Sequence, residues 1–104
     1  MKKIARIWFG SLPANKVEEY TEYVKQTGVK SLRQTKGNEG VLVITRKDKE
    51  NAEIGVISFW KSREDIHAFA GPDINKAVYY PEDKKFLTKM EPELLHYEVE
   101  VEEF

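Results

Sequence analysis

The sequence predicts a single α+β domain over residues 1–104, with one four-stranded sheet and one layer of helices. Two observations lead to this fold class. Runs of β-branched and aromatic residues alternate with helix-like segments in the order strand, helix, strand, strand, helix, strand. The length of 104 residues also suits one hydrophobic core, and no linker, internal repeat or low-complexity tract divides the chain.

The first strand is predicted over residues 4–9, where Ile, Trp and Phe precede a Gly-Ser-Leu-Pro turn. Asn15 is expected to cap a helix, because Glu18 three residues later approximates a capping box. Gly28 is placed to end this helix in a left-handed conformation. The polar segment 29–39 has no clear periodicity and ends in a Gly-Asn-Glu-Gly turn signal.

Two apolar runs predict the second and third strands, at residues 41–46 and 54–60, joined by the charged hairpin 47–53. Unbroken runs of Val, Ile and Leu are typical of strands that are covered on both faces. We therefore expect something to cover each face of this sheet.

The second half of the chain predicts a second helix capped by Ser62 and ended by Gly71. Asp73 is expected to cap a short helix through Val78, and Pro81 suits the first turn of a further one. The last strand is predicted over residues 93–102, in which apolar and polar residues alternate.

This order of elements predicts a split βαβ, ferredoxin-like βαββαβ fold with extra short helices. One helical layer covers only one face of a sheet, so the other face needs a partner. Because apolar residues lie on both faces of the second and third strands, we expect that partner to be a second copy of the chain.

Composition narrows the classes of partner. The chain holds no cysteine, which excludes disulfides and thiolate chemistry and makes the cytoplasm the expected location. Residues 1–52 hold 11 basic and 6 acidic residues, whereas residues 53–104 hold 6 and 12. The basic residues are scattered without interleaved aromatics, so nucleic-acid binding is not expected. No apolar run is long enough to span a bilayer, and no membrane association is expected.

Local strings along almost the whole chain resemble the antibiotic biosynthesis monooxygenase family, and in particular a mostly uncharacterised subgroup of it. The strings are Ile4-Ala5-Arg6-Ile7-Trp8, Phe59-Trp60-Lys61-Ser62, Ala68-Phe69-Ala70-Gly71, Tyr79-Tyr80-Pro81-Glu82-Asp83 and His96-Tyr97-Glu98-Val99. The resemblance implies that two subunits pair into a dimeric α+β barrel. It fixes the fold better than the reaction, since one fold hosts many functions.

The resemblance implies two chemistries. Some relatives oxidise phenolic or quinol-like molecules without metal, haem or flavin, by holding a substrate anion that reacts with dioxygen. Another branch binds haem through a histidine and degrades it. That histidine corresponds to Tyr79 here, its ring-distorting tryptophan corresponds to Phe69, and the first strand lacks that branch's asparagine. These differences argue against haem degradation, but tyrosine can ligate haem iron, so haem binding stays open.

Three residues are candidate catalytic groups: His67, His96 and Tyr79. An imidazole titrates near neutral pH and suits a proton acceptor, although a solvent or interface position is the favoured interpretation for both histidines. Pro81 restricts Tyr80 to an extended backbone, so Tyr79 and Tyr80 should point in different directions. One of the two tyrosines is therefore expected in the core and the other in a pocket.

Five residues are candidate substrate-binding groups: Arg6, Trp8, Trp60, Phe69 and Tyr80. For Trp60 the favoured role is a hydrophobic anchor at the corner between strand and helix. For Arg6 it is a surface or dimer ion pair, with the charge for an anionic substrate as the alternative. No metal site and no cofactor is expected.

Together these residues predict a pocket between the sheet and the helix at residues 62–70, lined by Trp60, Phe69 and one tyrosine. The leading hypothesis is a homodimeric, cofactor-independent monooxygenase-like protein that acts on or binds an aromatic or quinol-type small molecule. The alternatives are a non-catalytic ligand-binding or stress-response dimer on the same scaffold, and a haem-binding protein.

Overall fold

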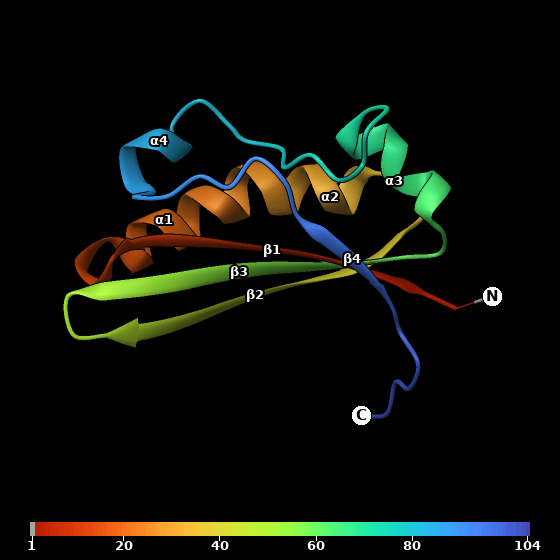
Figure 1. The fold of residues 1–104 in the computed structure, drawn as a ribbon, viewed down its shortest axis with the longest axis horizontal. Helices are drawn as coiled ribbons and strands as arrows, with labels where there is room; N and C mark the ends of the chain where they lie inside the picture. Colours follow the sequence, from red (N-terminus) through yellow and green to blue (C-terminus); the bar gives the residue numbers. More distant parts are fainter. Residues whose placement is uncertain (1) are drawn as a thin grey trace.

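The computed structural model describes residues 2–104. Four strands form one antiparallel sheet: β1 (Ile4–Pro13), β2 (Asn38–Asp48), β3 (Asn51–Trp60) and β4 (Leu95–Glu98). Their spatial order is β2-β3-β1-β4, so the first and third strands lie in the centre. This order, with helices on one side of the sheet (Figure 1), confirms the predicted ferredoxin-like α+β fold.

The helical segments are short. They are η1, a 3₁₀ turn (Ala14–Lys16), α1 (Val17–Val24), η2, a π-helical turn (Lys25–Val29), α2 (Lys30–Gln34), α3 (Arg63–Ala70) and α4 (Asp83–Phe86). The first four run without a break from residue 14 to residue 34, and we call them the long helix. They lie across one face of the sheet (Figure 1).

The long helix contradicts two predictions made from local signals. Asn15 does not cap it, because Asn15 lies inside η1 and no side chain caps η1 or α1. Gly28 does not end it, since the residues that flank η2, Val24 and Lys30, keep right-handed helical dihedrals. The π-helical turn lets the chain pass through Gly28 and continue into α2.

Residues 71–94 form a segment with little regular structure, which we call the cover segment. The helix predicted from Asp73 is absent there, because the Asp73 side chain accepts the backbone N–H of Asn75 and closes a turn instead. The segment is tied to the rest of the fold at scattered points, such as the N–H of Thr88 donating to the carbonyl of Ser11. It lies on the helical side of the sheet (Figure 1).

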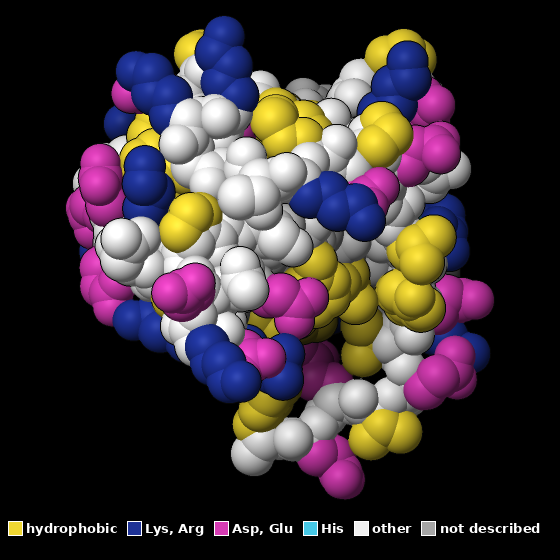
Figure 2. Space-filling model, turned by 60° about the vertical axis from the view of Figure 1, so that its left-hand side comes forward, with side chains coloured by type: hydrophobic (Ala, Val, Ile, Leu, Met, Phe, Trp, Pro, Cys, Tyr) yellow, Lys and Arg dark blue, Asp and Glu magenta, His cyan; other side chains and the backbone are white. Residues whose placement is uncertain are grey.

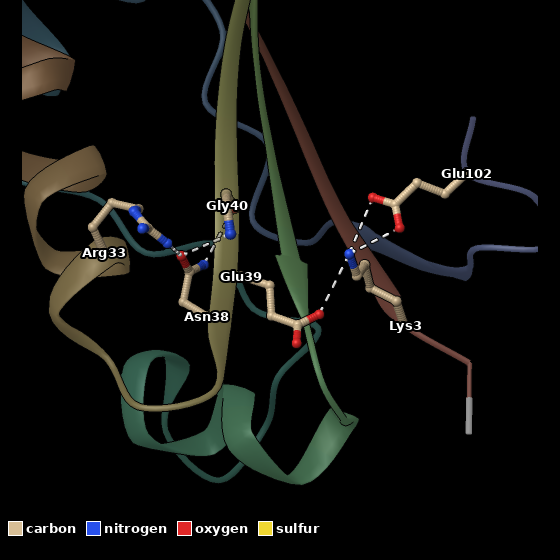
Figure 3. Close-up of polar contacts among 6 residues, drawn as sticks. All are labelled: Lys3, Arg33, Asn38, Glu39, Gly40 and Glu102. Atoms are coloured by element: carbon tan, nitrogen blue, oxygen red, sulfur yellow. Dashed lines mark hydrogen bonds and ion pairs between the residues drawn. The ribbon is translucent and has the colours of Figure 1, made fainter. Parts of the chain in front are cut away.

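The start of β2 carries a β-bulge that fixes one end of the sheet. Glu39 is the extra residue, and the neighbouring Asn38 side chain accepts from Arg33 at 2.8 Å and from the N–H of Gly40 at 3.2 Å. The Lys3 ammonium lies 3.5 Å from Glu39 and 3.0 Å from Glu102 (Figure 3). These contacts hold β1, β2 and the C-terminal residues together.

The core consists of two clusters between the sheet and the helices. One contains Leu12, Val17, Tyr20, Val24, Ala52, Ile54 and Leu87, and the other contains Ile4, Leu32, Trp60 and Ile66. Trp60 is fully buried, which confirms its favoured role as a hydrophobic anchor. Ser62 caps α3 as predicted, since its hydroxyl accepts the N–H of Asp65.

The other face of the sheet is apolar and uncovered in this chain. Strand register places Ile44 opposite Gly55 and Leu95 opposite Ile7 on this face. Leu42 is 48% exposed and Tyr97 is 51% exposed. We expected both faces of the sheet to be covered. Within the single chain, only the face under the helices is covered. We call this uncovered surface the open face.

Charged and hydrophobic side chains are mixed on the outer surface. On the side shown in Figure 2, basic and acidic side chains are interspersed with small hydrophobic patches. Among residues 2–104, no helix has the length and apolar character needed to cross a bilayer.

Candidate ligand-binding site between sheet and helices

A cavity of about 60 Å³ lies between the sheet, the long helix and the cover segment. Its walls include the side chains of Arg6, Trp8, Tyr20, Phe69, Tyr79, Tyr80 and Asp83. The volume holds a few water molecules, whereas a benzene ring needs about 150 Å³. An aromatic ligand is therefore larger than this cavity, and its binding requires the side chains of the wall to move apart.

Arg6 supplies a buried positive charge at this cavity. The residue is only 4% exposed, and its guanidinium donates to the carbonyls of Ile74 and Lys76 in the cover segment. It also lies 5.6 Å above the ring of Phe69. Burial lowers the pKa of Arg6 to about 10, so the group remains a cation at neutral pH.

No carboxylate within residues 2–104 forms an ion pair with Arg6. The favoured sequence interpretation, a surface or dimer ion pair, is contradicted because the guanidinium points inward and is buried. Successive residues of a strand face opposite sides of the sheet, so Arg6 shares the inner side with Trp8, two residues on. The alternative interpretation, a charge placed for an anionic ligand, agrees with this position.

His96 lies opposite Arg6 on the neighbouring strand β4 and is not part of the cavity wall. Its Nε2 is 3.0 Å from Nη1 of Arg6, and since a guanidinium can only donate, Nε2 accepts. Burial, followed by the charges of Arg6 and Arg63, lowers the pKa of His96 to about 4. At neutral pH the ring is therefore uncharged, its hydrogen is on Nδ1, and its lone pair is occupied by Arg6.

The Nδ1 atom of His96 is buried and has no hydrogen-bond partner within residues 2–104. The imidazole in this state offers no free lone pair to a substrate. The favoured interpretation of His96, a solvent or interface position, is wrong, because the strand register places it opposite the inward-facing Arg6. The geometry also supplies nothing for the other role, a proton acceptor. Instead it makes His96 a neutral neighbour of the buried guanidinium.

Tyr79 and Trp8 line one part of the cavity, and a chain of hydrogen bonds joins them. The indole N–H of Trp8 donates to the Tyr79 oxygen at 3.0 Å, and the Tyr79 hydroxyl donates to the carbonyl of Glu91 at 2.6 Å. The two rings meet edge to face, with centroids 6.0 Å apart. Burial raises the pKa of Tyr79, with smaller contributions from Asp83 and Glu91, so the phenol stays protonated.

Tyr80 also lines the cavity, beside Gly28 of the long helix. The expectation that only one of the two tyrosines faces a pocket is thus wrong, because both rings contribute to the wall. Both residues line the cavity, although Pro81 favours an extended backbone at Tyr80.

Asp83 is a functional candidate that the sequence did not reveal. The residue is 4% exposed, and it accepts from the Tyr20 hydroxyl at 2.8 Å and from the N–H of Tyr80 at 2.6 Å. Burial and the bond to Asp83 raise the pKa of Tyr20, which keeps that phenol protonated. No basic side chain within residues 2–104 pairs with Asp83.

Sequence reasoning interpreted Asp83 as an acid near the start of a helix, and Asp83 does begin α4. The signal that could have identified it is its spacing of three residues from Tyr80, which suits a side chain that closes a turn onto a backbone N–H. The burial of Asp83 depends on Tyr20 in the long helix, so the neighbouring sequence alone could not predict it.

Two predicted site residues do not reach the cavity. His67 is exposed on α3, where its Nδ1 lies 2.9 Å from the carbonyl of Gly71. Trp60 packs in the core, with its ring 6.4 Å from that of Phe69 and its N–H bonded to Ser58. Phe69, in contrast, reaches the cavity as predicted. No group of three or more potential metal ligands occurs within residues 2–104.

Solved structures share this fold over nearly the full length of the chain. A crystal structure from Bacillus cereus, of a protein with the provisional name antibiotic biosynthesis monooxygenase, has a TM-score of 0.70 and 12% identity. It matches 100% of this chain and 97% of its own. A protein of the same provisional name from Nitrosomonas europaea has a TM-score of 0.66 and 14% identity, over 95% of this chain and 91% of its own.

No protein-family model and no curated protein matches the sequence. At 12–14% identity the structural likeness shows a common fold. The class defined so far is a ferredoxin-like α+β domain with the fold of proteins named antibiotic biosynthesis monooxygenases. The fold expected from the local strings is thereby confirmed.

Proposed function

We propose that this protein binds a small phenol- or quinol-type aromatic molecule in the cavity and promotes its oxidation by dioxygen without a cofactor. The observation that carries the proposal is Arg6, a buried cation without an acidic partner within residues 2–104, in a cavity walled by aromatic rings. Such a wall with a few placed polar groups is the usual composition of a small-molecule site.

In the proposed reaction the substrate is a phenol whose keto tautomer carries a ring CH₂ group, as in an anthrone. It first gives a proton to water, and its anion is stabilised by the guanidinium of Arg6. A ring CH₂ group then loses its two hydrogens and gains one oxygen atom as a carbonyl. The second oxygen atom of dioxygen leaves with those hydrogens as water, so dioxygen is the only oxidant. Trp8, Phe69 and Tyr79 hold the ring against the guanidinium.

The second candidate is a non-catalytic ligand-binding or stress-response protein with the same cavity. One observation favours it: the Nε2 lone pair of His96 is occupied by Arg6, and the Tyr79 hydroxyl already donates to the carbonyl of Glu91, so neither group supplies a free base. Haem binding through Tyr79 is a third candidate, and it would require loss of the bonds to Trp8 and Glu91.

Oxygen consumption by metal-stripped protein, measured over a panel of hydroquinones and anthrones, tests the proposal. We expect consumption above the protein-free rate, and a loss of roughly 10²-fold or more in Arg6→Met. Arg33→Met is the matched control, because Arg33 is exposed and, within residues 2–104, its side chain bonds to Asn38 alone. Saturable binding, followed by Trp8 fluorescence, without oxygen consumption would replace the oxygenase with the non-catalytic candidate.

We further propose that the protein is a homodimer that pairs through the open face. Phe9, Leu42, Ile44, Leu95 and Tyr97 would leave water on pairing, which supports this arrangement. A cytoplasmic location is proposed on the basis of the cysteine-free sequence.

A further inference from the structure

We infer that Asp83 recognises a hydroxyl group, so that the ligand carries a hydroxyl at one end of its ring system and an anionic oxygen at the other. The inference deepens the proposed function and rests on it only for the place of the ligand, the cavity between sheet and helices. Nothing in the sequence pattern assigned a binding role to Asp83.

Asp83 has acceptor capacity left over. A carboxylate offers about four lone-pair sites, of which the Tyr20 hydroxyl and the Tyr80 N–H occupy two. Both of these donors are neutral, and the residue lines the cavity at 4% exposure. A buried carboxylate without its full set of donors is costly, so a donor entering the cavity is stabilised there.

Arg6 has donor capacity left over. A guanidinium has five N–H groups, and three of them are directed to Ile74, Lys76 and His96. The remaining donors belong to a residue that forms part of the cavity wall. They suit an anionic oxygen, because charge-assisted bonds are stronger than neutral ones.

Arg6 and Asp83 do not neutralise each other. No ion pair of 4.0 Å or less joins them, so the cavity presents a positive and a negative group at separate places. A ligand with only an anionic oxygen would leave Asp83 without a donor. A neutral phenol would leave Arg6 without an anion. A hydroxyaryl anion satisfies both groups.

Binding of 3- and 4-hydroxybenzoate, benzoate and phenol to the intact protein tests the inference by calorimetry. A bond to a charged acceptor is worth about 1.5–3 kcal/mol, so the better hydroxybenzoate should bind roughly 10-fold or more tightly than benzoate. Asp83→Asn keeps the shape of the side chain and an acceptor for Tyr20. It should reduce the ratio of hydroxybenzoate affinity to benzoate affinity at least several-fold. Glu82→Gln, at the exposed neighbouring acid, should leave the ratio unchanged.

Arg6→Met provides the complementary measurement. This substitution should weaken the binding of hydroxybenzoate and of benzoate by the same factor. The ratio of their two dissociation constants should therefore stay as in wild type. The inference is overturned if wild type binds none of the probes, if it does not distinguish hydroxybenzoate from benzoate, or if Asp83→Asn keeps the full ratio.

The two proposals fail separately. Hydroxyl discrimination that depends on Asp83, without oxygen consumption on any quinol, supports the recognition site and removes the oxygenase. Oxygen consumption by a protein that binds benzoate and hydroxybenzoate equally supports the oxygenase and removes the recognition site.

Discussion

One buried guanidinium determines the state of its neighbours. Arg6 donates to Nε2 of His96, and together with burial and Arg63 it holds the pKa of His96 near 4. The imidazole stays neutral, and the hydrogen bond orients the guanidinium from the neighbouring strand β4. His96 is therefore a positioning residue for Arg6, rather than the base that its residue type suggested.

Acid should destabilise the protein through His96. The folded-state pKa of about 4 lies below the ordinary 6.5, so the unfolded chain takes up a proton first as the pH falls. Stability is then full above pH 6.5 and is lost progressively down to pH 4. Because the ring is partly exposed, we discount the effect for screening to the order of 1 kcal/mol.

Urea unfolding of wild type and His96→Gln between pH 4 and 8 checks this prediction. Gln keeps an acceptor for Arg6 but does not titrate, so the variant should lose less stability than wild type on acidification. His67→Gln removes the exposed imidazole and should follow the wild-type curve. Parallel curves for wild type and His96→Gln would contradict the assigned role.

The residues that the sequence identified correctly are those whose role depends on near neighbours. Ser62 capped α3 through Asp65, three residues away, and the size of Trp60 was enough to predict burial. Arg6 and Asp83 could not be placed in this way. Their partners are carbonyls about 70 residues away and a tyrosine 63 residues away, which only the folded chain brings close.

At the scale of elements, the long helix shows how packing overrides a local stop signal. Glycine ends many helices because it adopts positive φ without strain. Gly28 has no positive φ here, and the π-helical turn around it carries the chain on to Leu32, which packs in the core with Trp60. Gly71, at φ 87°, is the glycine that ends a helix in the left-handed region.

Replacing each of these two glycines by alanine should change the free energy of unfolding in opposite directions. Gly28→Ala should raise the free energy of unfolding by about 0.5–1 kcal/mol, because helical glycine costs backbone entropy and the nearest atom, on Tyr80, is 3.8 Å from the new methyl group. Gly71→Ala should lower it by about 1 kcal/mol through the positive φ alone, since no atom lies within 4 Å. Urea titrations of both variants measure the difference, and equal signs would contradict it.

At the scale of the whole molecule, the sheet is covered on one side and apolar on the other. The alternation of β4 predicted that Leu95 and Tyr97 share a face, and both lie exposed on the open face. A predicted strand over residues 93–102 was too long, because regular pairing with β1 ends at Glu98. Periodicity identifies a face correctly but does not show where a partner strand ends.

Light scattering at micromolar concentration should give a dimer for wild type, since interfaces of this kind bury more than ~2,000 Å² in total. Leu42→Glu places a charge on the open face and should shift the protein to monomer. Gln26→Glu adds the same charge on the exposed side of the long helix and should remain dimeric. A monodisperse wild-type monomer would refute the proposed interface.

The pairing of β1 with β4 joins the two ends of the chain, Ile4 opposite Glu98. Contacts of such high contact order form slowly, because a long loop must close before they stabilise anything. Until residues 95–98 have paired, one edge of the central strand β1 has no partner and is open to aggregation. The contact between His96 and Arg6 therefore forms only when this late pairing of β1 with β4 is made.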